Sequence, residues 1–213
     1  MLRSFNSDKM YTYLKGYAMG KGMPNTLNAL NYARKLHKGQ TRKSGEEYII
    51  HPLTLACHAI SIGIDDDFIV AALILHDVVE DCGVSKNDLP VCDEVREAVQ
   101  LLSFFKPKDA NEDEVESAKK EYYETLSKNS ISAICKIFDR CHNVSTMAGV
   151  FSKEKLKSYI IETENYVLPL IRTTKDYYPQ YQAPLFVLKY HIVSVLDAIE
   201  GTIKTFSCEK GGN

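Results

Sequence analysis

The stretch ILHDVVED, residues 74–81, decides how this chain folds and what it can bind. It continues the apolar run of residues 69–75 and adds four ionisable side chains, His76, Asp77, Glu80 and Asp81. Residues three or four apart share a helix face, so we expect His76 over Glu80 and Asp77 over Asp81. Burial of unpaired charge is costly, and a bound metal ion is the simplest way to stabilise such a group.

Three further segments carry side chains of related chemistry. The segment HKGQTRKSGEEYIIHP, residues 37–52, is a basic loop that leads to a histidine. The segment KIFDRCHN, residues 136–143, has Asp139 and Asn143 one helical turn apart. The last segment, ETENYVLPL, spans residues 162–170. An isolated His-Asp pair is weak evidence of a site, whereas four ordered segments are strong evidence.

These four segments resemble a known family. The pattern His … His-Asp … Asp resembles the HD superfamily of metal-dependent phosphohydrolases. The segments are closer still to the hydrolase domain of RelA/SpoT homologues, which removes the 3′-diphosphate from (p)ppGpp. The resemblance covers about residues 24–175, which is most of the chain.

The resemblance implies a metal centre for one divalent ion. Its ligands would be His51, His76, Asp77 and Asp139. Imidazole and carboxylate groups suit a borderline divalent ion; Mn²⁺ is the family expectation, and Zn²⁺, Fe²⁺ or Co²⁺ could also bind. The remaining positions on the ion would be left for water and a substrate phosphate oxygen. Arg140 and His142 adjoin one ligand and could serve as its outer partners.

The same resemblance implies that Glu80 and Asp81 are the catalytic acids. They would orient and deprotonate the attacking water. The alternative is that both residues only end an ordinary amphipathic helix. Against that alternative, two acids here lie where the helix dipole disfavours negative charge, so another group must compensate them.

The resemblance also implies substrate-binding residues on three segments: Arg42, Lys43 and Ser44, then Asn143 and Thr146, and Tyr166. The basic pair would form one wall of a guanosine pocket, and the residues after Asp139 would contact the sugar and base. Taken alone, an Arg-Lys loop is more often a solvated turn, and a tyrosine in an apolar stripe is usually core. Many relatives have arginine where Ser145 stands, so one phosphate contact is in doubt here.

Length and composition favour a single domain. We expect one HD-type hydrolase domain over residues 1–213, with a core of about 24–175 and a C-terminal helix of about 180–206. The net charge of −2 gives no cationic field for nucleic acid or anionic membrane. No uninterrupted apolar run reaches the roughly 18 residues of a membrane span, and no signal peptide is evident, so a cytoplasmic protein without a membrane partner is expected.

The periodicity predicts an all-α fold, a compact multi-helix HD-domain bundle with a C-terminal helical extension. Apolar residues recur at helical spacing in about 25–38, 52–62, 66–81, 92–104, 114–127, 130–148, 153–174 and 180–206. Strands should be nearly absent. We expect the last helix to pack on the domain; the alternative is that its apolar stripe forms a homodimer interface.

The first hypothesis for function is therefore a stand-alone small alarmone hydrolase of the stringent response. It would cleave (p)ppGpp to GDP or GTP and pyrophosphate, and its partner would be a guanosine nucleotide. One alternative is an HD phosphohydrolase that acts on a different nucleotide. A nucleotide-binding pseudoenzyme is a third hypothesis, which is disfavoured because every ligand and both acids are present.

Overall fold

The computed structural model describes residues 5–105, 108 and 110–208, and the fold of this part of the chain is all-α, as predicted. The α-helices are α1 (Ser7–Lys21), α2 (Pro24–Leu36), α3 (Ile50–Ser61), α4 (Asp67–Leu75), α5 (Val78–Cys82), α6 (Asp93–Leu102), α7 (Glu112–Ser127), α8 (Ser130–Met147), α9 (Lys153–Glu162), α10 (Leu168–Tyr177) and α11 (Gln182–Cys208). Shorter turns are the 3₁₀-helices η1 (Lys86–Asp88) and η3 (Pro179–Tyr181) and the π-helix η2 (Thr163–Val167). Among the described residues, β-pairing is limited to one isolated bridge between Thr41 and Glu47.

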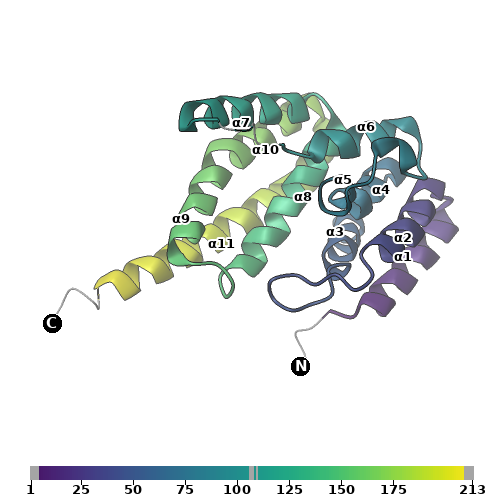
Figure 1. Cartoon of the computed structure of the whole chain (residues 1–213), viewed down its shortest axis with the longest axis horizontal. Helices are drawn as coiled ribbons and strands as arrows, with labels where there is room; N and C mark the ends of the chain where they lie inside the picture. The colour runs from purple at the N-terminus through teal and green to yellow at the C-terminus, as the bar shows by residue number, and fades with distance from the viewer. Residues whose placement is uncertain (1–4, 106–107, 109, 209–213) are drawn as a thin grey trace.

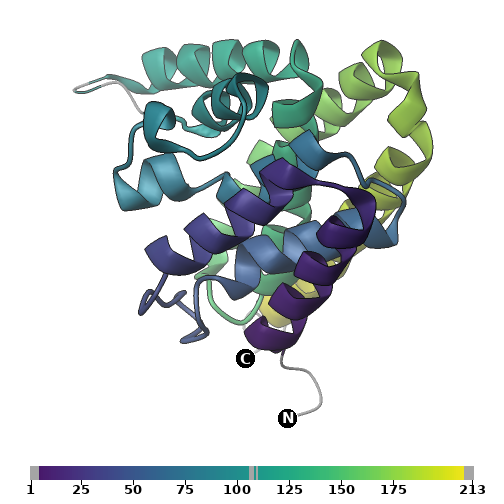
Figure 2. The ribbon, with the colours of Figure 1, turned by 90° about the vertical axis from the view of Figure 1, so that its right-hand side faces the viewer.

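Helix α8 runs through the middle of the bundle (Figure 1). Helices α1 to α5 lie on one side of it, and α7 and α9 to α11 lie on the other, an arrangement that the turned view also shows (Figure 2). α8 contacts α3 and α4 from the first group, α7, α10 and α11 from the second, and also α6. A residue on α8 can therefore meet side chains from both halves of the chain.

The buried centre of the first group is α4, in which every residue from Ile69 to Leu75 is at most 1 % exposed. Asp66 caps this helix, because its carboxylate accepts hydrogen bonds from the amides of Phe68 and Ile69. The next residue, Asp67, accepts from the amides at the start of α2 instead. This carboxylate satisfies the free N–H groups of α2, which has no side-chain cap of its own. It thereby fixes α2 against α4.

Two helices differ from the sequence prediction. α1 was not predicted, because its glycine-containing segment buries little more than Leu14 and Ala18 and so gives a weak periodic signal. The predicted continuous helix over 66–81 is wrong, because α4 ends at Leu75 and α5 begins at Val78. The apolar run that precedes the break hides it from periodicity. α5 ends at Gly83, whose left-handed φ of 65° suits glycine.

Helix α11 packs along α8 and α10, as expected for the C-terminal extension. Its buried side chains are Leu185, Leu188, Ile192, Leu196 and Ile199. Three apolar side chains on it are exposed: Phe186, Val187 and Tyr190. Among the described residues, one segment, Pro179–Lys204, is long and apolar enough to cross a membrane by length and composition alone, with a mean hydropathy of 1.2. The segment is not an uninterrupted apolar run, because single polar residues such as Lys189 divide it.

Candidate metal centre

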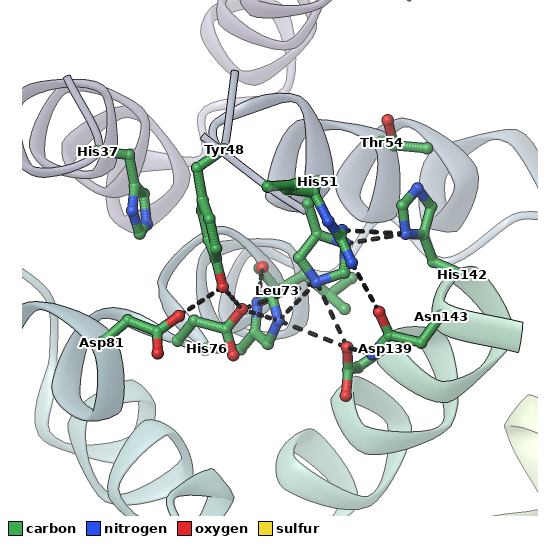
Figure 3. A network of polar contacts seen from close by, with 12 residues as sticks. His37, Tyr48, His51, Thr54, Leu73, His76, Asp81, Asp139, His142 and Asn143 are labelled. Atoms are coloured by element: carbon green, nitrogen blue, oxygen red, sulfur yellow. Dashed lines mark hydrogen bonds and ion pairs between the residues drawn. The ribbon is translucent and has the colours of Figure 1, made fainter. Parts of the chain in front are cut away.

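Four side chains from three parts of the chain converge at one point (Figure 3). They are His51 on the first turn of α3, His76 and Asp77 at the break between α4 and α5, and Asp139 on α8. The Nε2 atoms of His51 and His76 are 3.2 Å apart. Asp77 Oδ2 lies 2.9 Å from His76 Nε2, and Asp139 Oδ1 lies 3.3 Å from His51 Nε2. The structure thus brings together all four predicted ligands.

The donor set fits a single divalent ion. Donor atoms of His51, His76 and Asp77 lie within 4.8 Å of one another, and no other such group of His, Cys, Asp or Glu occurs in the described residues. Asp139 joins them through its contacts with both imidazoles, 3.3 and 3.8 Å long. Two neutral nitrogen donors and two carboxylates are a common ligand set for first-row divalent ions.

The break after α4 is what orients His76. The imidazole Nδ1 of His76 lies 2.9 Å from the carbonyl oxygen of Leu73, which can only accept, so Nδ1 carries the proton. In an uninterrupted helix that carbonyl would accept from the amide of Asp77. Nε2 of His76 points to the centre, and it is the nitrogen whose lone pair would be available to a metal ion. Asp77 still shares a helical bond with Asp81, whose amide donates to its carbonyl at 2.8 Å.

The ionisable groups of the centre are buried and lie close enough to shift one another's pKa values. Burial lowers the pKa of His51. Burial also opposes the charged form of His76, but the carboxylates of Asp77 and Asp139 outweigh it and raise the pKa of His76 to about 9. The pKa values of both carboxyls lie well below their usual range despite burial, because the imidazoles attract them. Without an ion, the centre therefore holds a proton on His76.

Tyr48 is a site residue that the sequence reasoning missed. Its hydroxyl lies 2.6 Å from Asp77 Oδ2 and 2.5 Å from Asp81 Oδ2, so it links a predicted ligand to a predicted catalytic acid. Burial and these carboxylates raise the pKa of Tyr48, which keeps its proton available for donation. The ring stacks on His37 at a centroid distance of 4.7 Å (Figure 3). His37 supports the Tyr48 ring in this way.

Lys136 was also missed, although it lies in a segment that carries the resemblance. Its ammonium is 3.6 Å from Asp139 Oδ2, the oxygen that is not directed to the imidazoles. Burial and the carboxylate of Asp77 raise the pKa of Glu80, and Lys136 opposes that shift. Lys136 therefore lies between a predicted ligand and a predicted catalytic acid. Its proximity to both could not be inferred from spacing along one helix.

A hollow of about 680 Å³ adjoins the centre. It is lined by the compact loop before α3 and by the C-terminal part of α8, and Figure 1 shows these segments at one edge of the molecule. The bridge between Thr41 and Glu47 closes this loop. Five of the six predicted substrate residues line the hollow: Arg42, Lys43, Ser44, Asn143 and Thr146.

Tyr166, the sixth predicted substrate residue, lies elsewhere. It stacks on Tyr123 at 5.0 Å, bonds Glu116 through its hydroxyl, and lines a separate hollow of about 400 Å³ beside α7. Of the two predicted outer partners, His142 contacts His51 with their Nδ1 atoms 2.9 Å apart. Arg140 instead pairs with Glu162.

Comparisons with known proteins bear on the family of this chain. The family model described as HD domain matches residues 29–165, more than half of the chain. A guanosine-3′,5′-bis(diphosphate) 3′-pyrophosphohydrolase of Vibrio cholerae is 36% identical over 143 residues, which are 65% of this chain and 20% of the relative. The bifunctional (p)ppGpp synthase/hydrolase SpoT of Escherichia coli is 34% identical over 143 residues with the same coverage. The chain thus spans about a fifth of the length of these relatives.

A solved structure, described as a metazoan ortholog of SpoT that hydrolyzes ppGpp, has the same fold. It superposes with a TM-score of 0.61 over 82% of this chain and 94% of that chain, at 19% identity. The superposition supports the all-helical architecture, and the family model covers the segments that carry the metal centre. This chain belongs to the HD domain family, whose metal dependence fits the four converging side chains.

Proposed function

We propose that this chain is a metal-dependent phosphohydrolase that removes the 3′-diphosphate of (p)ppGpp and yields GDP or GTP and pyrophosphate. The single observation that carries the proposal is the convergence of His51, His76, Asp77 and Asp139 beside a basic hollow. The names of the relatives supply the substrate class. Such an enzyme would act in the cytoplasm during the stringent response.

Mn²⁺ is the ion we propose for the centre. The mixed imidazole and carboxylate donors suit a first-row divalent ion, and Mn²⁺ is the ion that the family resemblance implies. When bound, a divalent ion polarises a phosphoryl oxygen and makes an adjacent water more acidic. The protein side chains hold the centre, and the outer contacts of His76 and Asp139 fix which donor atoms face it.

Glu80 and Asp81 are the residues we propose to handle the attacking water. The pKa of Glu80 is raised toward neutral pH, and a general base works best when its pKa lies near the working pH. Asp81 is held by the hydroxyl of Tyr48, which also contacts Asp77. One acid would then accept the proton of the water while the other orients it. Lys136 would offset negative charge beside them.

The hollow is the proposed nucleotide pocket. Arg42 is held by bonds from its edge to α8, so the face of its guanidinium remains the surface on which a purine would stack. Lys43 would approach a phosphate, and Ser44, Asn143 and Thr146 would provide polar contacts. Tyr166 would meet the substrate only if the nucleotide extended from the metal centre to the hollow beside α7.

One observation favours a second candidate, hydrolysis of a different nucleotide at the same centre. The family resemblance implies an arginine where Ser145 stands, and in this chain the Ser145 hydroxyl lies 2.8 Å from His191 Nε2 on α11. A cation is therefore replaced by a neutral contact between two helices. A substrate with fewer phosphates would suit that change.

Turnover of ppGpp tests the proposal. The purified chain, loaded with Mn²⁺, is incubated with ppGpp, and the products are separated by ion exchange. We expect GDP and pyrophosphate from the wild type, none from Asp77→Ala, and a strong loss of rate with retained metal in Glu80→Gln. Release of inorganic phosphate, or turnover in Asp77→Ala, would contradict it. Metal binding without turnover of ppGpp, followed by turnover in a nucleotide panel, would favour the second candidate.

We also propose that two copies associate through α11. The exposed side chains of Phe186, Val187 and Tyr190 support this, since they form an apolar patch on one helix. Light scattering should give the mass of a dimer, and Phe186→Asp should give a monomer. A monomer at all concentrations of the wild type would exclude the proposal.

A further inference from the structure

The guanidinium of Arg42 forks toward two consecutive residues of α8. Its Nη1 lies 3.4 Å from His142 Nδ1, and its Nη2 donates to Asn143 Oδ1 at 2.9 Å. Each of these residues in turn contacts a predicted metal ligand. We infer that Arg42 is a positioning residue of the metal centre. It holds the proposed ligand His51 through His142 and the proposed ligand Asp139 through Asn143, and we call each of these two paths a relay.

The first relay fixes the tautomer of His51. Arginine stays protonated, so Arg42 can only donate to His142 Nδ1, and that nitrogen must carry a lone pair. His51 Nδ1, which is 2.9 Å from the same atom, must then be the protonated nitrogen of its ring. The lone pair of His51 is left on Nε2, the atom that faces His76 and Asp139. Burial and the nearby His51 and Arg42 lower the pKa of His142 to about 3, in keeping with a neutral acceptor.

The second relay orients Asp139. Because Asn143 Oδ1 accepts from Arg42, its amide nitrogen points the other way and donates to Asp139 Oδ1 at 2.6 Å. This is the oxygen that faces the imidazoles, 3.3 Å from His51 Nε2. The other oxygen faces Lys136. The carboxylate is therefore held at both ends, and only one of its oxygens is available to an ion.

The two relays join the loop before α3 to the metal centre. Arg42 belongs to this loop, whose ends are paired at Thr41 and Glu47, whereas its acceptors belong to α8. Loss of Arg42 would free both acceptors at once and loosen two ligands. The inference rests on the metal centre of the proposed function, but it does not depend on which nucleotide is the substrate.

The sign of the effect separates this role from simple electrostatics. A positive charge beside a cation site repels the cation, so removal of Arg42 would tighten metal binding if charge alone mattered. Loss of outer partners of metal ligands weakens binding instead, by about 10- to 100-fold. Lys43 provides the matched control, because it carries the same charge on the same loop and its ammonium lies over the Phe151 ring, 6.0 Å from the centroid.

The test is titration of the metal-free full chain with Mn²⁺ in the absence of nucleotide. Electron paramagnetic resonance of the free ion monitors binding. Arg42→Ala should raise the Kd about 10- to 100-fold, and Lys43→Ala should leave it unchanged or lower it. His142→Ala and Asn143→Ala should each give part of the loss. In a variant that already lacks Arg42, either change should add less than it does in the wild type.

Thermal unfolding of the metal-free variants controls for misfolding, and Arg42→Lys, which keeps the charge but cannot fork, carries the test if Arg42→Ala does not fold. Arg42→Ala with a Kd equal to or below that of the wild type would overturn the inference. Additive losses in the double variants would do so too. Failure of the wild type to hydrolyse ppGpp would leave this result standing, whereas failure to bind Mn²⁺ would refute both proposals.

Discussion

Tyr48→Phe tests the link between the metal centre and the catalytic acids. The change removes one hydroxyl, which contacts Asp77 Oδ2 at 2.6 Å and Asp81 Oδ2 at 2.5 Å, and keeps the ring that stacks on His37. One proton serves two carboxylates here, so its loss removes this donor from both of them. A hydrogen bond to a charged group contributes about 1.5–3 kcal/mol. If that energy is needed in the transition state, kcat/KM falls about 10- to 150-fold.

The assay is steady-state turnover of ppGpp by Mn²⁺-loaded wild type and variant, with the Kd for Mn²⁺ measured in parallel. The metal affinity should change less than the rate, because Asp77 keeps its contact with His76 at 2.9 Å. Tyr17→Phe is the matched control: it removes a tyrosine hydroxyl that donates to Asp65 at 2.9 Å on the surface. A kcat/KM of Tyr48→Phe within twofold of the wild type would refute the assigned role of the hydroxyl.

The remaining predictions concern pH, charge and packing. The pKa of His76 is raised to about 9, and its proton must leave before an ion binds. The Kd for Mn²⁺ should therefore fall about tenfold per pH unit from about pH 6 to 8 and level off above about pH 9. A Kd that does not change with pH, measured by calorimetry, would contradict this. Lys136→Met should move the acid limb of the pH–rate profile upward, since Lys136 opposes the rise in the pKa of Glu80, and a downward shift would contradict it. Phe138→Ala should lower the free energy of unfolding of the metal-free protein in urea by about 3–5 kcal/mol, because Phe138 is fully buried against His58. A loss below about 1 kcal/mol would contradict this and show that the cavity collapses.

The sequence predicted what local pattern controls. The helices of the bundle follow from apolar periodicity, and α4 was found because its run of buried residues is unbroken. The convergence of the four proposed ligands was predicted because each lies in a short segment that carries the family resemblance. The break at His76 was not predicted, since it depends on a side-chain bond to the Leu73 carbonyl that periodicity does not record.

Contacts between distant segments account for what the sequence did not reveal. The partners of Tyr48 lie about 30 residues further along the chain, and those of Arg42 lie about 100 residues away, on α8. Neither pairing has a spacing rule, because each depends on how the loop before α3 meets other helices. Tyr166 illustrates the converse, since a motif match placed it near the nucleotide while packing stacks it on Tyr123.

Anomalous diffraction from crystals grown with Mn²⁺ tests the central claim most directly. We expect one manganese peak, within coordination distance of donor atoms of His51, His76, Asp77 and Asp139. The peak should be absent from Asp77→Ala crystals grown in the same way. A peak that lacks any of these four ligands in the wild type, or a second peak of equal height beside it, would contradict the single-ion centre.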